Sequence, residues 1–275
     1  PAVGARPVSY RNFYGLTSRD YETTDTDVAT GRVEHDFGGA ASLRSIARFG
    51  RTRRDSLITA PRFESNTRTA IRRTDWRSRD QSDAIAASQT DLTSRFRTGA
   101  VAHTVVTGLE VSREQSENWS RIEEGVTSPS TDLFAPDYSA PYESRLVRSG
   151  AVTDATADAA AVFLFDTVHL GPRFELTGGL RWDHFALDYR TVDAAGDERT
   201  FQRTDRMVSW RSGAVFKPRA NGSVYLGVGT SLNPSTEGLS LSAATAALEP
   251  ETSHSLVAGT KWDLFAGPLG VTRPA

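Results

Sequence analysis

A predicted hairpin decides the fold class: residues 207–228 read MVSWRSGAVFKPRANGSVYLGV. Apolar and polar side chains alternate in this stretch, stop alternating at a short turn, and then alternate again. Successive side chains of a β-strand point to opposite faces of a sheet, so a period of two residues gives each strand one apolar and one polar face. We expect an antiparallel hairpin with Trp210 and Phe216 on its apolar face and Arg211 and Lys217 on its polar face.

The same alternation recurs along most of the chain and predicts about ten strands, with no convincing helix and no internal repeat. The clearest expected strands cover approximately residues 29–37, 43–59, 84–97, 103–117, 159–169, 174–189, 207–217, 224–228 and 256–264. The alternation slips near His184, because Phe185, Leu187 and Tyr189 fall out of step with the residues before them. A β-bulge or an exit from a membrane would account for this slip.

Short and long connections alternate between these strands. We expect short turns at Gly38, Gly99, Gly171, Asn221 and Gly267, and long connections around Trp76, Tyr138, Ala195 and Ser240. The connection expected at about residues 118–156 is too long for an ordinary loop of a globular domain. Loops of such length are usually functional or disordered.

The composition excludes several classes of protein. The 275 residues are 38% hydrophobic with a formal net charge of -2, which argues against a disordered polymer. The longest apolar run, at 159–165, is far shorter than the roughly 20 residues of a membrane-spanning helix. Absence of cysteine excludes thiol catalysis, cysteine-ligated zinc and disulfides. Residue 1 is Pro and no signal-peptide pattern follows it, so we expect a processed or partial chain.

Two architectures produce strands with alternating faces. A soluble β-sandwich usually has shorter strands, and its short and long connections are not sorted to opposite ends. An outer-membrane β-barrel has that asymmetry, and it places aromatic side chains near the membrane interfaces. Phe37, Phe174, Phe216 and Phe265 all lie beside expected short turns. The pattern therefore favours a transmembrane β-barrel.

Several short motifs follow one another in the order that a known family has. They are residues 12–16 (NFYGL), 19–22 (RDYE), 34–37 (EHDF), 50–52 (GRT), 54–56 (RDS), 233–234 (NP), 248–251 (LEPE) and 259–265 (GTKWDLF). Their order and spacing resemble the barrel domain of TonB-dependent siderophore receptors, most closely the catecholate type. One position departs from the family, which usually has Glu where this chain has Val257.

The resemblance implies both the fold and the location. It implies an all-β, antiparallel transmembrane β-barrel in the bacterial outer membrane, with short periplasmic turns and long extracellular loops. Residues 1–275 would be a partial barrel domain with about ten of the roughly 22 strands of such a receptor. The plug domain and the C-terminal strands of the family would be lacking from these residues.

No catalytic residue, metal site or cofactor is expected. His35 and Asp36, like Asp183 and His184, are neighbours in a strand and therefore point to opposite faces, so neither pair can act together. The chain has no GxSxG, P-loop or HExxH motif. We accordingly do not expect an enzyme.

Binding residues are expected in the long connections. Ferric catecholate complexes are anionic and aromatic, so arginine charge and ring stacking are the chemistry that a receptor needs. The candidates are Arg72, Arg73, Trp76, Trp119, Arg121, Phe134, Tyr138, Tyr142, Arg145 and Arg148. A second set of arginines is expected on the polar inner face, against a plug or a water-filled lumen: Arg32, Arg44, Arg48, Arg181 and Arg211.

The expected function is uptake of a ferric siderophore, energised through TonB. The implied partners are the siderophore, TonB through the lacking plug region, and outer-membrane lipid, but no nucleic acid. A passive porin-type channel is the first alternative, and it would need a constriction loop with opposed charges. A barrel enzyme such as a protease is the second, and it would lose activity when one Asp or His is changed.

Overall fold

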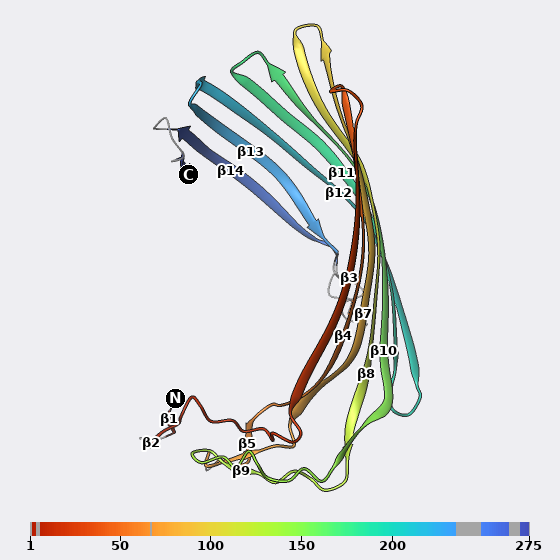
Figure 1. The fold of residues 1–275 in the computed structure, drawn as a ribbon, viewed down its shortest axis with the longest axis vertical. Coiled ribbons are helices and arrows are strands. Elements are labelled where there is room, and N and C mark those ends of the chain that lie inside the picture. Colours follow the sequence, from red (N-terminus) through yellow and green to blue (C-terminus); the bar gives the residue numbers. More distant parts are fainter. Residues whose placement is uncertain (1, 4–5, 67, 235–248, 264–269, 275) are drawn as a thin grey trace.

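The computed structural model describes residues 2–3, 6–66, 68–234, 249–263 and 270–274. Its main element is an open antiparallel sheet of ten strands in sequence order, with β3 and β15 at the edges (Figure 1). The strands are β3 (Tyr21–Asp36), β4 (Ala41–Thr59), β7 (Trp76–Thr98), β8 (Val101–Glu124), β10 (Arg145–Leu170), β11 (Phe174–Val192), β12 (Glu198–Arg219), β13 (Gly222–Asn233), β14 (Glu251–Asp263) and β15 (Gly270–Pro274). The predicted all-β antiparallel fold is confirmed, and the sheet does not close into a barrel by itself.

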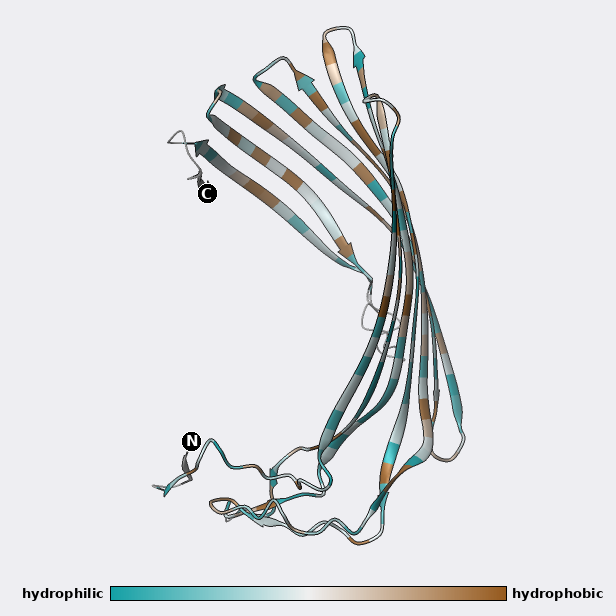
Figure 2. Ribbon diagram, viewed as in Figure 1, coloured by the Kyte–Doolittle hydropathy of each residue, from teal (hydrophilic) through white to brown (hydrophobic). Residues whose placement is uncertain are grey.

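The two faces of this sheet differ in chemistry. Leu109, Val162, Trp182 and Val208 stand side by side in one row across β8, β10, β11 and β12, on what we call the outer face. The opposite, inner face carries charge: Arg181 on β11 bonds Glu110 on β8 across 3.0 Å. In Figure 2, hydrophobic residues (brown) and hydrophilic residues (teal) alternate along β11 to β14, as expected for strands with one apolar and one polar face. Both faces therefore arise from the two-residue period of the sequence.

The side chains named in advance lie on the expected faces. Trp210 and Phe216 are on the outer face, paired with Leu180 and Phe174, while Arg211 and Lys217 are on the inner face. The five arginines expected to face inward also share the inner face: Arg32, Arg44, Arg48, Arg181 and Arg211. Phe265, the expected short turn at Gly267 and the expected long connection around Ser240 lie outside the described residues.

The two ends of the sheet also differ. Short turns join β3 to β4, β7 to β8, β10 to β11 and β12 to β13 at one end, the turn end (Figure 1). Gly38 and Gly171 have φ angles of 86° and 68° in these turns, a conformation that favours glycine. The connections from β4 to β7 and from β8 to β10 gather at the opposite, loop end, with the small strands β5 (Arg62–Phe63), β6 (Ala70–Arg72) and β9 (Thr131–Asp132). Segment 8–20, which precedes β3, lies there too. The connection around Ala195 was expected to be long, but it is a tight turn of residues 193–197 between β11 and β12, because the two strands stay paired up to Val192 and Glu198.

The strands reach further toward the loop end than predicted. β7 begins at Trp76, and β8 and β10 remain paired up to Glu124 and Arg145. The connection expected at about 118–156 is therefore shorter and covers residues 125–144. The prediction was wrong because these strand ends have polar side chains on both faces, so the alternation that marks a strand disappears although the backbone pairing continues.

Of the two explanations offered for the slip near His184, a β-bulge or an exit from the membrane, the bulge is absent from the described sheet. Ladders from β11 to β10 and to β12 run through His184 without a shift of register. Phe185, Leu187 and Tyr189 therefore stay on the inner face with Arg181. The slip arises because, beyond His184, the apolar side chains of β11 lie on the inner face and the polar ones on the outer face. A separate short strand pair, β1 (Ala2–Val3) with β2 (Arg6–Pro7), precedes the sheet. None of the described residues belongs to a helix long and apolar enough to cross a membrane.

Candidate ligand-binding site

The ten residues predicted to bind ligand do not form one cluster. Arg73, Phe134, Tyr138 and Tyr142 lie in the connections at the loop end, whereas Trp76, Trp119, Arg121 and Arg148 lie in strands. Arg72 ends β6 and Arg145 begins β10. The predicted set therefore divides into groups with different surroundings.

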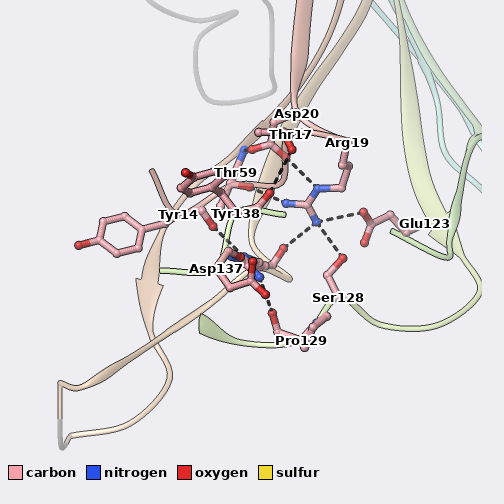
Figure 3. Close-up of polar contacts among 11 residues, drawn as sticks. Tyr14, Thr17, Arg19, Asp20, Thr59, Glu123, Ser128, Pro129, Asp137 and Tyr138 are labelled. Atoms are coloured by element: carbon pink, nitrogen blue, oxygen red, sulfur yellow. Dashed lines mark hydrogen bonds and ion pairs between the residues drawn. The ribbon is translucent and has the colours of Figure 1, made fainter. Parts of the chain in front are cut away.

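Two buried arginines hold the connections of the loop end together (Figure 3). Arg19, in segment 8–20, is 3% exposed and donates to the Thr59 and Ser128 hydroxyls, the carbonyl oxygen of Arg73 and the carboxylate of Glu123. Glu123 lies 3.3 Å from the guanidinium. A buried charge is stable only when it is paired and hydrogen-bonded, as this one is.

Arg73 is the other member of this buried arginine pair. It is 1% exposed, and its guanidinium donates to the carbonyl oxygens of Tyr14, Pro129 and Asp137. These carbonyls belong to segment 8–20 and to connection 125–144. Removing Arg73 would leave buried carbonyl oxygens without a donor, which is costly. These contacts give Arg73 a structural part in holding the loops.

Three predicted aromatic residues lie in the connection 125–144. The ring of Tyr142 has the Arg19 guanidinium carbon 5.8 Å from its centre, and burial, followed by the nearby Glu123 carboxylate, raises the pKa of Tyr142 to about 12. The Phe134 ring lies under Arg6 at 3.9 Å. Tyr138 is 52% exposed, and its carbonyl accepts a hydrogen bond from the Thr17 backbone. Of the three, Tyr138 offers the most open side chain.

Arg121 and Arg148 belong to a ladder of ion pairs on the outer face. Arg121 bonds Asp55 at 2.6 Å and Asp80 at 3.2 Å, and Arg148 bonds Asp80 at 2.8 Å. Tyr21 joins the ladder through Asp55, so it crosses β3, β4, β7, β8 and β10. The charged groups of this ladder pair with one another on the outer face, and they do not point toward the inner face.

The remaining predicted residues lie near the ladder or at strand ends. Arg148 stacks 4.6 Å above the Trp119 ring, whose nitrogen donates to Glu117. Arg72 and Arg145 are exposed and pair with Asp75 and Glu124. Trp76 stands opposite Thr59 at the start of β7. Exposed pairs of this kind contribute little to stability.

An aromatic patch that the sequence analysis missed lies on the inner face near the loop end. Leu187 is 1% exposed and packs with Ala155 and Ala157, and the partly buried rings of Phe185, Tyr189 and Phe201 surround them. The Tyr189 and Phe201 rings are 6.4 Å apart. The sequence did contain a signal for this patch. After His184 the apolar residues of β11 stand at odd positions, and odd positions of this strand face inward.

Charged groups border the aromatic patch. Leu187 stands opposite Arg203 on β12, and Phe185 stands opposite Asp205. Arg203 bonds Asp205 Oδ1 at 2.7 Å, while Asp205 Oδ2 is buried without a hydrogen-bond partner among the described residues. A ligand with rings and negative charge would find stacking and a guanidinium here.

Arginine and aromatic side chains also meet deeper on the inner face. The Arg211 guanidinium carbon lies 3.9 Å from the centre of the Phe165 ring, and Arg181 lies 5.9 Å from that of Phe163. The Phe163 ring fills the space above Gly108, where a Cβ atom would come within 2.2 Å of it. Cation–π contacts of this kind extend from the patch toward the turn end.

Among the described residues the inner face carries one histidine–carboxylate pair, beside the turn end: His169 Nδ1 lies 3.5 Å from Glu175 Oε1, and Glu175 also pairs with Lys217. The described residues contain no group of three or more His, Asp or Glu side chains placed to hold a metal ion. His103 bonds Asp166 at 2.7 Å, but this pair lies on the outer face beside the turn end.

An antiparallel sheet with an apolar outer face, a charged inner face and long connections at one end is the architecture of an outer-membrane β-barrel. The family model "TonB dependent receptor-like, beta-barrel" matches residues 2–272. The chain belongs to this family of outer-membrane receptors.

Relatives support this membership. The chain is 30% identical to the catecholate siderophore receptor Fiu of Escherichia coli K12, over 96% of this chain and 39% of that protein. A crystal structure of the ferric-catecholate import receptor Fiu in its closed form matches with a TM-score of 0.86 at 29% identity, over 98% of this chain and 42% of that one. The siderophore receptor PiuA of Acinetobacter baumannii has the same fold, with a TM-score of 0.84 at 24% identity, over 96% and 41%. The chain thus spans about two fifths of these relatives.

Proposed function

We propose that this chain forms part of the barrel of a receptor that takes up a ferric siderophore of the catecholate type. The observation that carries the proposal is the aromatic patch of Phe185, Tyr189 and Phe201 beside Arg203, on the inner face near the loop end. The names of the relatives, catecholate siderophore receptor and ferric-catecholate import receptor, describe a ligand that suits this surface. The relatives are transport receptors by name, and we propose no enzymatic activity for this chain.

Different residues of the patch would make different contacts with the ligand. Phe201 and Tyr189 offer faces on which catechol rings stack, each such contact contributing about 0.5–1.5 kcal/mol beyond its buried area. Arg203 offers positive charge to an anionic complex. Exposed Tyr138 and Arg145 at the loop end would make the first contacts.

Energy would come from outside these residues. TonB-dependent uptake requires a plug domain that senses the ligand and contacts TonB, and we assign that part to the remainder of the receptor. The inner-face arginines, including Arg48 and Arg211, would face the plug or the water around it. Iron would stay wrapped by the siderophore, because no metal ligand set occurs among the described residues.

Ligand binding to the complete receptor tests the proposal. Replacing Tyr189 and Phe201 together by Ala should weaken binding of a ferric catecholate about tenfold, measured by quenching of tryptophan fluorescence. Phe216→Ala is the matched control, since its ring stacks on Phe174 at 4.7 Å on the outer face. Unchanged binding in the double variant would contradict the site.

The alternatives give different results in cells. Growth on the ferric siderophore as sole iron source should require TonB. Uptake that continues without TonB would favour a passive channel, and a siderophore recovered chemically altered would favour an enzyme.

A further inference from the structure

We propose that Arg19 and Arg73 are positioning residues for ligand binding. They fix three segments of the loop end as one unit, so that exposed side chains of this unit meet the ligand on a backbone that is already ordered. Neither guanidinium would touch the ligand. This inference rests on the proposed function and deepens it, by naming residues that act on binding through the loops.

The three segments, which we call the cap, are residues 8–20 and the described residues of connections 60–75 and 125–144. A small sheet of β5, β6 and β9 joins the two connections, because Ile71 on β6 stands opposite Thr131 on β9. In Figure 1 the cap projects from the loop end to the side toward which β13 and β14 curve. A barrel closes around that side, so the cap lies across part of its mouth.

Buried side chains and hydrogen bonds join segment 8–20 to both connections. Leu16, Ile71 and Leu133, one from each segment, are all buried. The side chains of Asn12 and Tyr14 both donate to the carbonyl oxygen of Leu133, each at 2.8 Å. The cap therefore has buried apolar side chains and cross-links of its own, and it is not a set of independent loops.

Arg19 fastens the cap to the wall of the barrel (Figure 3). Its guanidinium donates to Thr59 at the end of β4 and to Glu123 near the end of β8, and it also reaches Ser128 within the cap. Asp20, next to Arg19, accepts a hydrogen bond from the Thr59 backbone at 2.9 Å. Arg19 thus fixes the position of the cap relative to these two strands.

Arg73 fixes the arrangement inside the cap. Its three guanidinium nitrogens donate to three different carbonyl oxygens, which belong to Tyr14 at 2.8 Å, Pro129 at 3.4 Å and Asp137. Its own carbonyl oxygen accepts a hydrogen bond from Arg19 at 3.1 Å. A planar guanidinium presents its donors in fixed directions. The three acceptors therefore set how the segments that carry them lie relative to one another.

Tyr138 is the exposed side chain that depends most directly on this arrangement. Its ring is 52% exposed, yet its carbonyl accepts from the Thr17 backbone at 3.0 Å, and the preceding carbonyl, of Asp137, accepts from Arg73. A ring on an ordered backbone binds without a further loss of backbone freedom. Ordering even one backbone residue on binding would weaken affinity about tenfold. Without Arg73, this cost falls on ligand binding.

Stopped-flow fluorescence of the complete receptor tests the proposal, with the ferric complex of a synthetic tris-catechol chelator as the probe. Arg73→Gln should make the probe dissociate about tenfold faster, because Tyr138 is no longer held in place. Arg62→Gln is the matched control, since Arg62 is exposed on β5 in the same connection, and it should leave the rate unchanged. Receptor that fails to fold lowers the amplitude of the signal and not the rate constant. Equal dissociation rates in Arg73→Gln and the parent receptor would overturn the proposal.

Two further variants separate positioning from charge. Arg73→Lys keeps the positive charge but carries its donors on one nitrogen, which cannot reach three separate carbonyls, so the probe should dissociate as fast as from Arg73→Gln. A parental rate with lysine would show that charge alone acts at this position, and it would refute positioning. Asn12→Ala/Tyr14→Phe removes a second tie within the cap, and it should speed dissociation in the same direction by a smaller factor.

Hydrogen exchange of the backbone amides checks the cap without any ligand. In Arg73→Gln, the amides of segment 8–20 and of connection 125–144 should exchange faster together, while those of the paired strands β8 and β10 should not change. Faster exchange confined to residues 68–75 would show that the segments are independent, and the positioning role would then be wrong.

A failure of the proposed function would look different from a failure of positioning. A parent receptor that does not bind the probe would contradict the proposed function and the positioning role together. If the Tyr189/Phe201 double variant loses binding while the probe leaves Arg73→Gln at the parental rate, the proposed function stands and the positioning role is rejected.

Discussion

The inner and outer faces of the sheet change chemistry at the same level, but in opposite directions. Toward the turn end, the outer face is apolar at Trp182 and the inner face is charged at Arg181. Past His184, the outer face becomes charged at Asp158 and Arg113, and the inner face becomes aromatic at Tyr189. The ladders run through this level without a shift of register. The apolar and polar faces therefore change places at the level where the surroundings of the sheet change, while the pairing of the strands stays the same.

The largest expected effect is a charge placed on the apolar part of the outer face. Trp210→Arg should lower the free energy of unfolding by about 2–4 kcal/mol, because an arginine near the membrane midplane loses its hydration. Ser209→Arg, one residue earlier and on the inner face, should cost far less. Refolding of both variants of the complete receptor into lipid vesicles, followed by denaturant titration, measures the difference. An equal loss at both positions would break the assignment of the faces.

A smaller effect is expected in the aromatic patch of the inner face. Leu187→Ala should cost about 2–3 kcal/mol, since Leu187 is 1% exposed and its removal leaves a cavity. Asp188→Ala, on the outer face next to it, should stay within about 0.5 kcal/mol. The same titration reports both values. If Asp188→Ala cost more than Leu187→Ala, the packing would belong to the other face.

The smallest effect concerns the ion-pair ladder of the outer face. Asp80→Asn should cost about 0.2–1 kcal/mol, because the pairs are partly open to water. Partial burial acts to raise the pKa of Asp80, but bonds from Arg148 and Arg121 outweigh it and hold the pKa below its ordinary value of 3.8.

The pH dependence of Asp80 follows from that sign. A lowered pKa in the folded state means that its stabilisation is complete above about pH 4 and is lost as pH falls further, through the folded-state pKa. The parent and Asp80→Asn should therefore converge in stability in acid and differ at neutral pH. Asp188→Asn serves as control, and a difference that persists unchanged in acid would contradict the ladder.

Much of the architecture could be predicted from the sequence, for a physical reason. Where one face meets lipid and the other meets water or protein, the two-residue period is strong, and Trp210 and Arg211 were assigned correctly. Turns such as Gly38 and Gly171 were found because glycine is needed where φ is positive. Both signals are local and require no knowledge of distant contacts.

The loop end could not be predicted in the same way. Beyond the membrane both faces of a strand meet polar surroundings, so the continuation of β8 to Glu124 left no period to detect. Trp119 and Arg148 were expected in a loop, although they stack on the outer face of paired strands. The patch around Leu187 appeared in the sequence as an irregularity, because its meaning depends on β10 and β12 both pairing with β11.

The buried arginine pair has a consequence for the order of folding. Arg73 bonds carbonyls of Tyr14 and Asp137, so it ties together segments separated by more than a hundred positions along the chain. Hairpins between neighbouring strands close short loops and form quickly, whereas contacts across such distances carry a larger entropic cost. We therefore expect the tie at Arg73 to form after the sheet is assembled. We also expect these loops to open at a lower free energy than the paired strands, which hydrogen exchange of their amides would measure.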